Sequence, residues 1–355
     1  MKRPNAYCSA FSKALAALIA PAKSADSTRR AAQRGFNATI PKILQIFLFT
    51  LAACVSQPAQ PPKFPEPIAE IPFEIDYEGW ITVQATVNGE GPYDFIVDSG
   101  ATITSVFENL AREQTFSPVE RPPIKILGLT AAEQLPAYFL GEIQIGGQRL
   151  QNHIGVILPD WAPPRRPPNG VLGLDFLTRF IVHVDVNEKL IRLYDPGEDL
   201  DGLGDAWSKT PLKPDDFNQN SGTLYRVTAD MQGRPIPCLV DLGASGTMLN
   251  YHALRRLLSG IFINQPRETG FFTGTRLNDI FDNTEVARLV HVKRITIAGA
   301  KWRDKLLTVF DAPVFDELGV DNKPYCLIGS DLMLEFSFIF DFRRQLLYIG
   351  PQARL

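Results

Sequence analysis

The sequence after residue 70 contains two copies of one unit, and this internal duplication restricts the fold more than any other feature. In the first copy an apolar run ends at Asp98, which Ser-Gly-Ala follows, and Val-Leu-Gly comes later at 171–173. In the second copy a similar run ends at Asp241, which Leu-Gly-Ala follows, and Leu-Ile-Gly comes later at 327–329. The two Asp residues lie 143 positions apart and the two later Gly residues 156 apart, so both copies keep one order of landmarks. A long-period repeat of this kind predicts two similar lobes.

The segments between these landmarks have the composition of β-strands. Short runs of β-branched and aromatic residues are bounded by Gly, Pro or turn pairs, Asn-Gly at 88–89 and Gln-Gly at 232–233. Gly and Pro number 26 and 28, which favours a turn-rich β protein over a helical bundle. Short helices are expected over Phe176–Phe180 and over Tyr251–Leu258, where Asn250 can act as the N-cap. The predicted fold class is mostly β, in two similar lobes.

Charge is unevenly distributed along the chain. Residues 1–42 carry eight Lys or Arg against one acid, so that with a net charge of −3 for the whole chain the remaining residues carry −10. A body this acidic repels the phosphate backbone, which argues against nucleic acid as a partner.

Metal and disulfide-rich classes are disfavoured by the spacing of the ligand-type residues. The four cysteines show no Cys-x-x-Cys pair, and no histidine lies near a Cys or a second His at ligand spacing. These residues are Cys8, Cys54, Cys238, Cys326, His153, His183, His252 and His291. We therefore expect no metal and no cofactor, and surface or core roles for the histidines.

The N-terminal segment has the pattern of an export signal. A basic flank up to Lys42 precedes a short uncharged apolar run at 43–50 and the small residues Leu-Ala-Ala before Cys54. The run is too short for a stable membrane span. Leu-Ala-Ala-Cys resembles the bacterial lipoprotein box, which implies lipidation of Cys54; the alternative is an ordinary signal peptide with an incidental Cys. Val55 is not Asp, which in that class favours the outer membrane, facing the periplasm.

The repeated motifs carry a resemblance to a known family. Two copies of hydrophobic-hydrophobic-Asp-x-Gly-Ala, each followed by hydrophobic-hydrophobic-Gly, resemble the retropepsin-like aspartic proteases, in the bacterial single-chain form with two fused lobes. The resemblance covers about 71–355 and implies two β-barrel lobes related by a pseudo-twofold axis, with the active site between them. It implies that Asp98 and Asp241 are the catalytic pair. The loop residues that it implies around them are Ser99, Gly100, Ala101, Leu242, Gly243 and Ala244.

The chemistry of such a pair follows from electrostatics. Two carboxyl groups about 3 Å apart cannot both ionise, so they share one proton. The charged member accepts a proton from a water held between them, while the neutral member polarises the scissile carbonyl. Asp175 and Asp331, two residues after the landmark Gly residues, are better explained as helix caps. Leu242 stands where the family has Ser or Thr, and this is the weakest point of the resemblance.

Two further features follow from the resemblance. The strands that carry Cys238 and Cys326 are neighbours in the family fold, so a disulfide is possible in an exported protein, with two buried free thiols as the alternative. Hairpin flaps are expected to cover the cleft. Their expected substrate-binding residues are Gly128, Leu129 and Thr130 in the first lobe and Phe272, Thr273 and Gly274 in the second.

These observations define a domain plan and a function. We expect a leader and signal at 1–54, a Pro-rich tether at 55–70, a first lobe at 71–196, a linker at 197–216 and a second lobe at 217–355. The predicted protein is a monomeric, lipid-anchored aspartic endopeptidase of the bacterial cell envelope that acts on peptides or proteins. Two alternatives stay open: a two-lobed peptide-binding lipoprotein that has lost activity, and a structural envelope lipoprotein without a peptide cleft.

Overall fold

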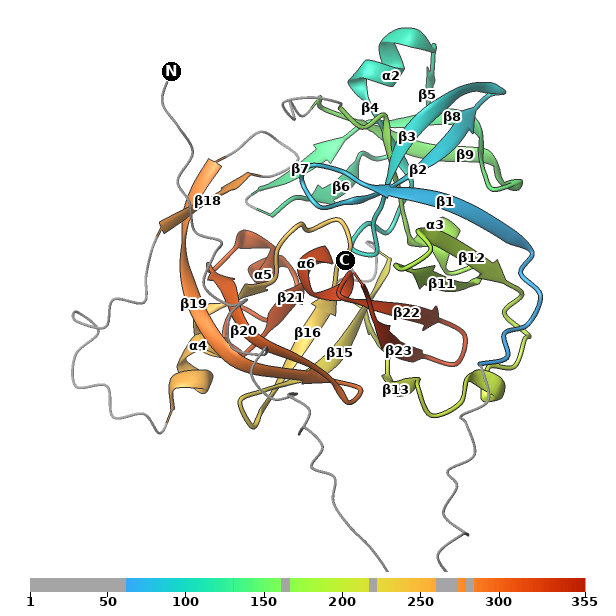
Figure 1. Ribbon diagram of the computed structural model, residues 1–355. Coiled ribbons are helices and arrows are strands. Elements are labelled where there is room, and N and C mark those ends of the chain that lie inside the picture. The colour runs from blue at the N-terminus through green and yellow to red at the C-terminus, as the bar shows by residue number, and fades with distance from the viewer. Residues whose placement is uncertain are drawn as a thin grey trace, which may run out of the picture. The chain divides into compact units, whose positions relative to one another are not determined.

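The computed structural model describes residues 62–129, 131–160, 167–216, 222–259, 274–278 and 284–354, and these residues form a mostly β protein (Figure 1). The strands of the first half are β1 (Ala69–Ile75), β2 (Ile81–Val87), β3 (Glu90–Val97), β4 (Ser105–Phe107), β5 (Ser117–Pro118), β6 (Ile124–Leu127), β7 (Ala132–Leu135), β8 (Ala137–Ile145), β9 (Gln148–Leu158), β10 (Gly170–Leu172), β11 (Ile181–Asp185) and β12 (Leu190–Tyr194). The mostly β fold class predicted from the sequence is confirmed.

The second half repeats this strand-rich pattern. Its strands are β13 (Ser208–Pro211), β14 (Lys213–Asp216), β15 (Thr223–Met231), β16 (Arg234–Val240), β17 (Met248–Leu249), β18 (Gly274–Asn278), β19 (Thr284–Ile297), β20 (Ala300–Val309), β21 (Cys326–Ile328), β22 (Phe336–Asp341) and β23 (Leu346–Gln352). The helices are α2 (Glu108–Glu113), α3 (Leu174–Leu177), α4 (Tyr251–Leu258), α5 (Pro313–Glu317), α6 (Ser330–Met333) and the 3-10 helix η1 (Asp201–Leu203).

The first half closes into a six-stranded β-barrel. Its strands run in the order β2, β3, β10, β4, β9 and β8, and pairing of β2 with β8 closes the ring. Burial along β2 alternates, with Ile81, Val83, Ala85 and Val87 facing the core. The predicted turn at 88–89 joins β2 to β3, and both of its residues have positive φ, which Asn and Gly adopt readily.

The second half forms a ring-like sheet with the corresponding strand order. Strands β15, β16, β21, β17, β20 and β19 follow one another, and β19 pairs back to β15. In both rings the strand before the Asp pairs in parallel with the strand before the landmark Gly, as β3 with β10 and β16 with β21. The turn at 232–233 again has two positive φ values. The duplication seen in the sequence is therefore also a duplication of strand order.

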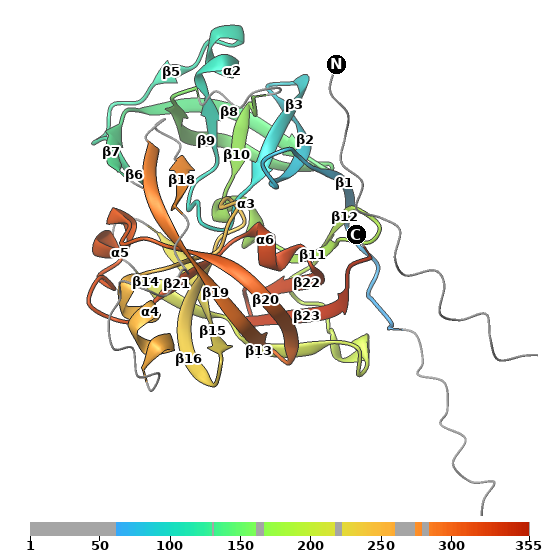
Figure 2. The same ribbon diagram turned by 60° about the vertical axis from the view of Figure 1, so that its left-hand side comes forward.

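A shared sheet joins the two halves. Strand β11 pairs antiparallel with β22, so that His183 lies opposite Ile339, and β13 extends this sheet beyond β23. Figure 2 shows β11, β12, β22 and β23 side by side between the rings. One continuous apolar cluster contains core residues of both rings, including Leu242 in the second. Strand pairing and apolar packing thus fix the two rings against each other.

The two predicted helices and the predicted linker agree with the structure to different extents. Helix α4 spans the predicted Tyr251–Leu258, and the Asn250 side chain accepts a hydrogen bond from the Ala253 amide as its N-cap. The helix predicted at Phe176–Phe180 instead begins at Leu174 and ends at Leu177. Gly173 is its N-cap residue and no side chain caps it. Asp175 and Asp331, expected as helix caps, instead lie in the first turns of α3 and α6, where they accept from the hydroxyls of Thr104 and Thr247. The expected linker at 197–216 contains η1, β13 and β14, so part of it belongs to the sheets.

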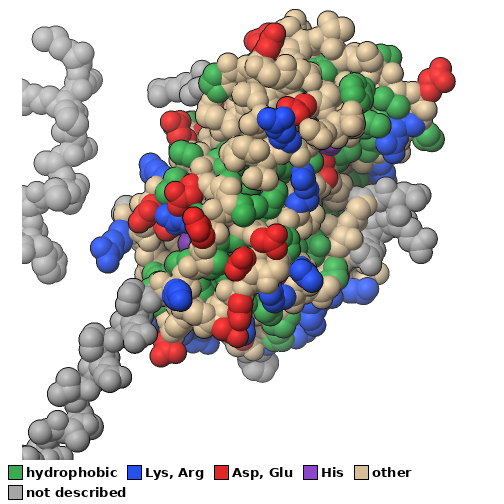
Figure 3. Space-filling model, turned by 90° about the vertical axis from the view of Figure 1, so that its right-hand side faces the viewer, with side chains coloured by type: hydrophobic (Ala, Val, Ile, Leu, Met, Phe, Trp, Pro, Cys, Tyr) green, Lys and Arg blue, Asp and Glu red, His purple; other side chains and the backbone are tan. Residues whose placement is uncertain are grey.

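The surface in Figure 3 carries acidic and basic side chains that are interspersed rather than gathered by sign. No helix in the described part of the chain is long and apolar enough to cross a membrane. The leader, Cys54 and residues 55–61 of the expected tether lie outside the described residues. Phe64, close to the first described residue, packs against the shared sheet. Its ring lies 4.8 Å from the ring of His183 and 5.8 Å from that of Trp207.

Candidate active site

A cavity of about 430 Å³ lies between the two rings and contains both expected catalytic residues. Asp98 follows β3 of the first ring, and Asp241 follows β16 of the second. Apart from these two, the charged residues that line the cavity are Glu78 and Lys125 within the described part of the chain. Most other lining side chains are apolar, among them Trp80 and Leu318. The described residues include no group of three or more His, Cys, Asp or Glu side chains arranged to hold a metal ion.

The Asp98 loop holds its carboxylate with backbone amides. The Asp98 amide donates to the Leu172 carbonyl at 3.0 Å, which fastens the end of β3 to β10. Asp98 Oδ1 accepts from the amides of Gly100 at 2.7 Å and Ala101 at 3.1 Å. These bonds compensate the cost of placing a carboxylate at the end of a buried strand.

The Asp241 loop repeats this arrangement with one difference. The Asp241 amide donates to the Ile328 carbonyl at 2.9 Å, and Asp241 Oδ1 accepts from the Gly243 amide at 2.9 Å. The Ala244 amide donates to the backbone carbonyl of Asp241 at 3.3 Å. Asp98 therefore receives two amide donors on one side-chain oxygen from its own loop, whereas Asp241 receives one.

The two active-site loops lie so close together that a glycine of each loop faces the aspartate of the other. A Cβ on Gly100 would lie 2.5 Å from Asp241 Cγ, and a Cβ on Gly243 would lie 2.3 Å from Asp98 Cγ. Neither distance is possible between real atoms, so any side chain at these positions would push the carboxyl groups apart. The carboxyl groups of Asp98 and Asp241 therefore interact directly, and each influences the pKa of the other. The structure thus brings together the two Asp residues that the repeat predicted.

Burial and mutual repulsion change the acidity of the pair. Burial raises the pKa of Asp98 above its ordinary value, although backbone amides oppose this shift. The pKa of Asp241 is raised well above its ordinary value, first by burial and then by the charge on Asp98. One proton shared by the pair, residing mainly on Asp241, is the state that this geometry favours.

Ser99 links the two rings behind the carboxyl groups. Its hydroxyl donates to the Val240 carbonyl at 2.8 Å and accepts from the Leu242 amide at 3.0 Å. Ser99 is 3% exposed, so both bonds lie in the interior. Leu242, which has no hydroxyl to return the contact, is 1% exposed and packs in the apolar cluster. The departure from the motif at Leu242 replaces a polar contact by apolar packing.

Each landmark Gly is held against its loop by a Thr-Asp pair. Thr104 Oγ1 donates to Asp175 Oδ1 at 2.6 Å and accepts from the Gly173 amide at 3.0 Å. In the second ring, the Thr247 hydroxyl donates to Asp331 at 2.7 Å and accepts from the Gly329 amide at 3.1 Å. Sequence reasoning did not single out the two Thr residues. A signal was present, because each Thr follows its Asp by six positions in both copies.

A hairpin of the first ring covers the cavity where a flap was expected. Strands β6 and β7 pair antiparallel, and Gly128 donates its amide to the Ala131 carbonyl at 2.8 Å across the turn. Gly128 and Leu129 line the cavity, while Thr130 lies outside the described residues. On β6, Lys125 forms an ion pair with Glu317 of α5, so the hairpin is attached to the second ring.

The expected flap of the second ring is described only in part. Phe272 and Thr273 lie outside the described residues, and Gly274 begins β18. Strand β18 pairs with β19, and Leu277 of β18 lines the cavity. The described end of this segment thus reaches the cavity wall.

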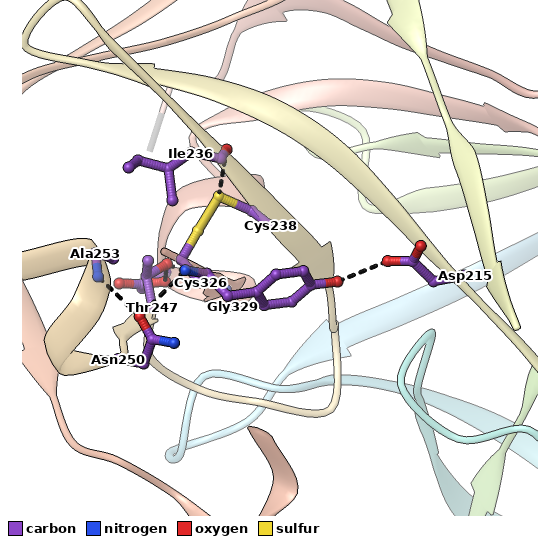
Figure 4. The surroundings of a disulfide bond; sticks show 10 residues. Asp215, Ile236, Cys238, Thr247, Asn250, Ala253, Cys326 and Gly329 are labelled. Carbon is purple, nitrogen blue, oxygen red and sulfur yellow. Dashed lines mark hydrogen bonds between the residues drawn. A yellow bond between two sulfur atoms is a disulfide. The ribbon is translucent and has the colours of Figure 1, made fainter. Parts of the chain in front are cut away.

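Cys238 and Cys326 form a disulfide bond in the structure (Figure 4). They are direct partners in the parallel pairing of β16 with β21, three residues before Asp241 and before the landmark Gly of this ring. At the equivalent register of the first ring, Phe95 lies opposite Gly170, where a Cβ would be 2.4 Å from the Phe95 ring. The same strand junction is therefore fastened covalently in one ring and by an aromatic ring packed on glycine in the other.

Comparison with known families supports this assignment for the first ring. A family described as "Aspartyl protease" matches residues 83–176, a range that includes Asp98, its loop and Gly173. No curated protein matches the chain. Residues 83–176 thus contain an aspartyl protease domain of the retropepsin-like kind, which suggests a peptidase and peptide substrates.

Proposed function

We propose that this protein is an aspartic endopeptidase whose catalytic pair is Asp98 and Asp241. The observation that carries the proposal is the approach of two carboxyl groups in a cavity between the rings, each so close to the other loop that only glycine fits beside it. The family match covers only the first of them, and the second is assigned by the repeated loop, strand order and close glycine. Related by a pseudo-twofold axis, the two rings would act as the two lobes of one enzyme.

The two carboxyl groups take different roles in the proposed reaction. Asp98, with two amide donors on Oδ1, is the ionised member and accepts a proton from a water bound between the carboxyl groups. Asp241 carries the shared proton and donates a hydrogen bond to the carbonyl oxygen of the scissile bond. Water attacks the carbonyl carbon, and collapse of the tetrahedral intermediate breaks the C–N bond as the leaving nitrogen takes a proton from the pair. Both groups belong to one chain, so a monomer suffices.

The substrate would lie in extended form under the β6–β7 hairpin. Gly128 and Leu129 of this hairpin and Leu277 of β18 line the cavity, which offers backbone edges and apolar side chains to a peptide. We further propose, from the sequence alone, that Cys54 is lipidated and that the 55–70 tether holds the enzyme at the outer membrane, facing the periplasm of the bacterial cell envelope.

The test is cleavage of a mixed peptide library, read by mass spectrometry, with Asp98→Asn and Asp241→Asn as variants of the same size. Loss of cleavage in both variants supports the shared-proton mechanism. Peptide binding by the wild type without cleavage would instead select the alternative of an inactive peptide-binding lipoprotein. Cleavage that survives Asp241→Asn would show that the second ring is not catalytic.

A further inference from the structure

The two active-site loops are held by the same chain of hydrogen bonds, except at its last member. In each ring the residue after the landmark Gly donates its amide to the active-site loop, Leu174 to Ala101 and Ser330 to Ala244, both at 2.8 Å. The landmark Gly amide donates to a Thr hydroxyl, and that hydroxyl donates to an Asp on the following helix. We call these parallel networks the loop braces, built on Thr104 in the first ring and Thr247 in the second.

The last member of each brace satisfies the backbone carbonyl of its Thr. In the second ring, the amide of Thr308 on β20 donates to the Thr247 carbonyl at 3.1 Å. In the first ring, the partner of the Thr104 carbonyl is a side chain, His153 on β9, whose Nε2 lies 2.7 Å from the oxygen. A main-chain donor of one ring is thus replaced in the other by a donor that can gain or lose a proton.

The chemistry of the two neighbouring oxygens defines what the imidazole does. A carbonyl oxygen only accepts, so His153 Nε2 carries a proton and donates to Thr104. On the other side of the ring, Nδ1 lies 3.7 Å from Asp175 Oδ2, the carboxylate that also accepts from the Thr104 hydroxyl. Both ring nitrogens therefore face acceptors. The imidazole thus contacts two members of the first-ring brace, the Thr104 carbonyl and the Asp175 carboxylate.

Asp175 is the acidic group that lies against the His153 ring. The side chain is 9% exposed, and Gly141 lies opposite it on β8. Next on β8, Glu142 is paired with Arg149 of β9 at 3.5 Å. Beyond α3, Arg179 donates to the backbone carbonyl of Arg149. The acidic group against the imidazole is therefore a member of the loop brace itself.

We propose that His153 is a positioning residue for Asp98, because it holds the loop brace of the first ring through the Thr104 carbonyl. The path from His153 to the catalytic carboxylate runs through Thr104, then Gly173 and Leu174 to Ala101, whose amide donates to Asp98. This inference depends on the proposed peptidase function only where it predicts a change in kcat. The hydrogen bonds that brace residues 98–107 are present whatever the function is.

The experiment compares two substitutions of His153 with a matched histidine outside the brace. His153→Gln keeps a donor near the position of Nε2 but cannot become a cation, whereas His153→Leu removes the donor. His291→Gln is the control, because His291 also faces an acid, Asp304 at 3.3 Å, but lies on β19 away from both loops. For each protein, kcat and KM are measured with a peptide that the wild type cleaves. Amide hydrogen exchange of residues 98–107 is measured on the same proteins.

We expect His153→Gln, which keeps a donor, to stay within about twofold of the wild type in kcat. His153→Leu should lose about tenfold in kcat with KM little changed, and exchange in 98–107 should be faster. His291→Gln should change neither quantity.

Three results would overturn the proposal. His153→Gln could lose as much kcat as His153→Leu, although it keeps a donor. His153→Leu could lower the melting temperature while leaving kcat and exchange in 98–107 unchanged, which would be a purely structural role. The His291→Gln control could reproduce the effects. If the wild type cleaves no peptide, the proposed function is wrong. The positioning role is then tested by hydrogen exchange alone, and unchanged exchange of residues 98–107 in His153→Leu would reject it.

Discussion

Replacing Ser99 by Ala removes the polar link between the two rings. The Ser99 hydroxyl makes two bonds at once, to the Val240 carbonyl at 2.8 Å and from the Leu242 amide at 3.0 Å. Without the hydroxyl, a buried acceptor and a buried donor lose their partners, and each unpaired group costs about 1–3 kcal/mol. The sum, about 3 kcal/mol, is a large part of the usual stability of a folded domain.

The loss should be visible in calorimetry and in turnover. At about 2–4 °C per kcal/mol for a chain of this size, Ser99→Ala should lower Tm by roughly 6–12 °C. Because the lost bonds lie directly behind the two carboxyl groups, kcat should fall ten- to hundredfold, the range expected when reacting groups are misplaced by about 1 Å. Ser99→Thr keeps the hydroxyl and should retain most of both properties.

Ser245→Ala is the matched control, since this Ser follows the equivalent motif in the second ring but is exposed. It should leave Tm within about 1 °C, because exposed substitutions usually change stability by less than ~0.5 kcal/mol. An equal fall in Tm for Ser99→Ala and Ser245→Ala, or no fall for either, would refute the claim that the buried hydroxyl joins the rings.

Four further predictions concern the pair, the flap and the shared sheet. Asp241→Asn should abolish cleavage, while Leu242→Thr, which exchanges core packing for a hydroxyl, should keep turnover within about tenfold, a change of ~1.4 kcal/mol in the barrier; steady-state kinetics decides both. Replacing Lys125 by Glu, or Glu317 by Lys, should speed hydrogen exchange in β6–β7, and the double replacement should restore slow exchange. If exchange stays fast in the double variant, the ion pair is not what attaches the hairpin. Burial lowers the pKa of His183 to about 4 from an ordinary 6.5, so the unfolded state binds more protons than the folded state between these pH values. The free energy of unfolding should therefore fall by about 3 kcal/mol as the pH drops through that range. Urea titrations should show a smaller fall for His183→Phe. The raised pKa values of the aspartate pair keep its shared proton at higher pH, so the rate should peak at mildly acidic to near-neutral pH, and a peak confined to strong acid would contradict this.

The sequence by itself determined the features that depend on neighbours along the chain. The two Asp loops were found because a strand, a carboxylate and a glycine lie in one short motif that occurs twice. Helix α4 was predicted to its ends, since Asn250 and the helix that it caps interact within one turn. The hairpin turns at 88–89 and 232–233 were predicted from turn pairs that end in Gly, which tolerates the positive φ found at Gly89 and Gly233. In each case the energy that selects the conformation comes from groups a few residues apart.

Tertiary structure decided the contacts between residues that are remote in sequence. Whether Cys238 and Cys326 remain thiols depends on the register of two parallel strands, and the structure places them opposite each other and joins them. The bonding of Thr104 with Asp175, across 71 residues, and of Lys125 with Glu317, across 192, depends on ring closure. Sequence reasoning placed His153 on a surface or in a core because nothing near it along the chain indicates a partner. Its role arises only when β9 closes the first ring and brings the imidazole to the Thr104 carbonyl, since a hydrogen bond acts over about 3 Å of space and is independent of separation along the chain.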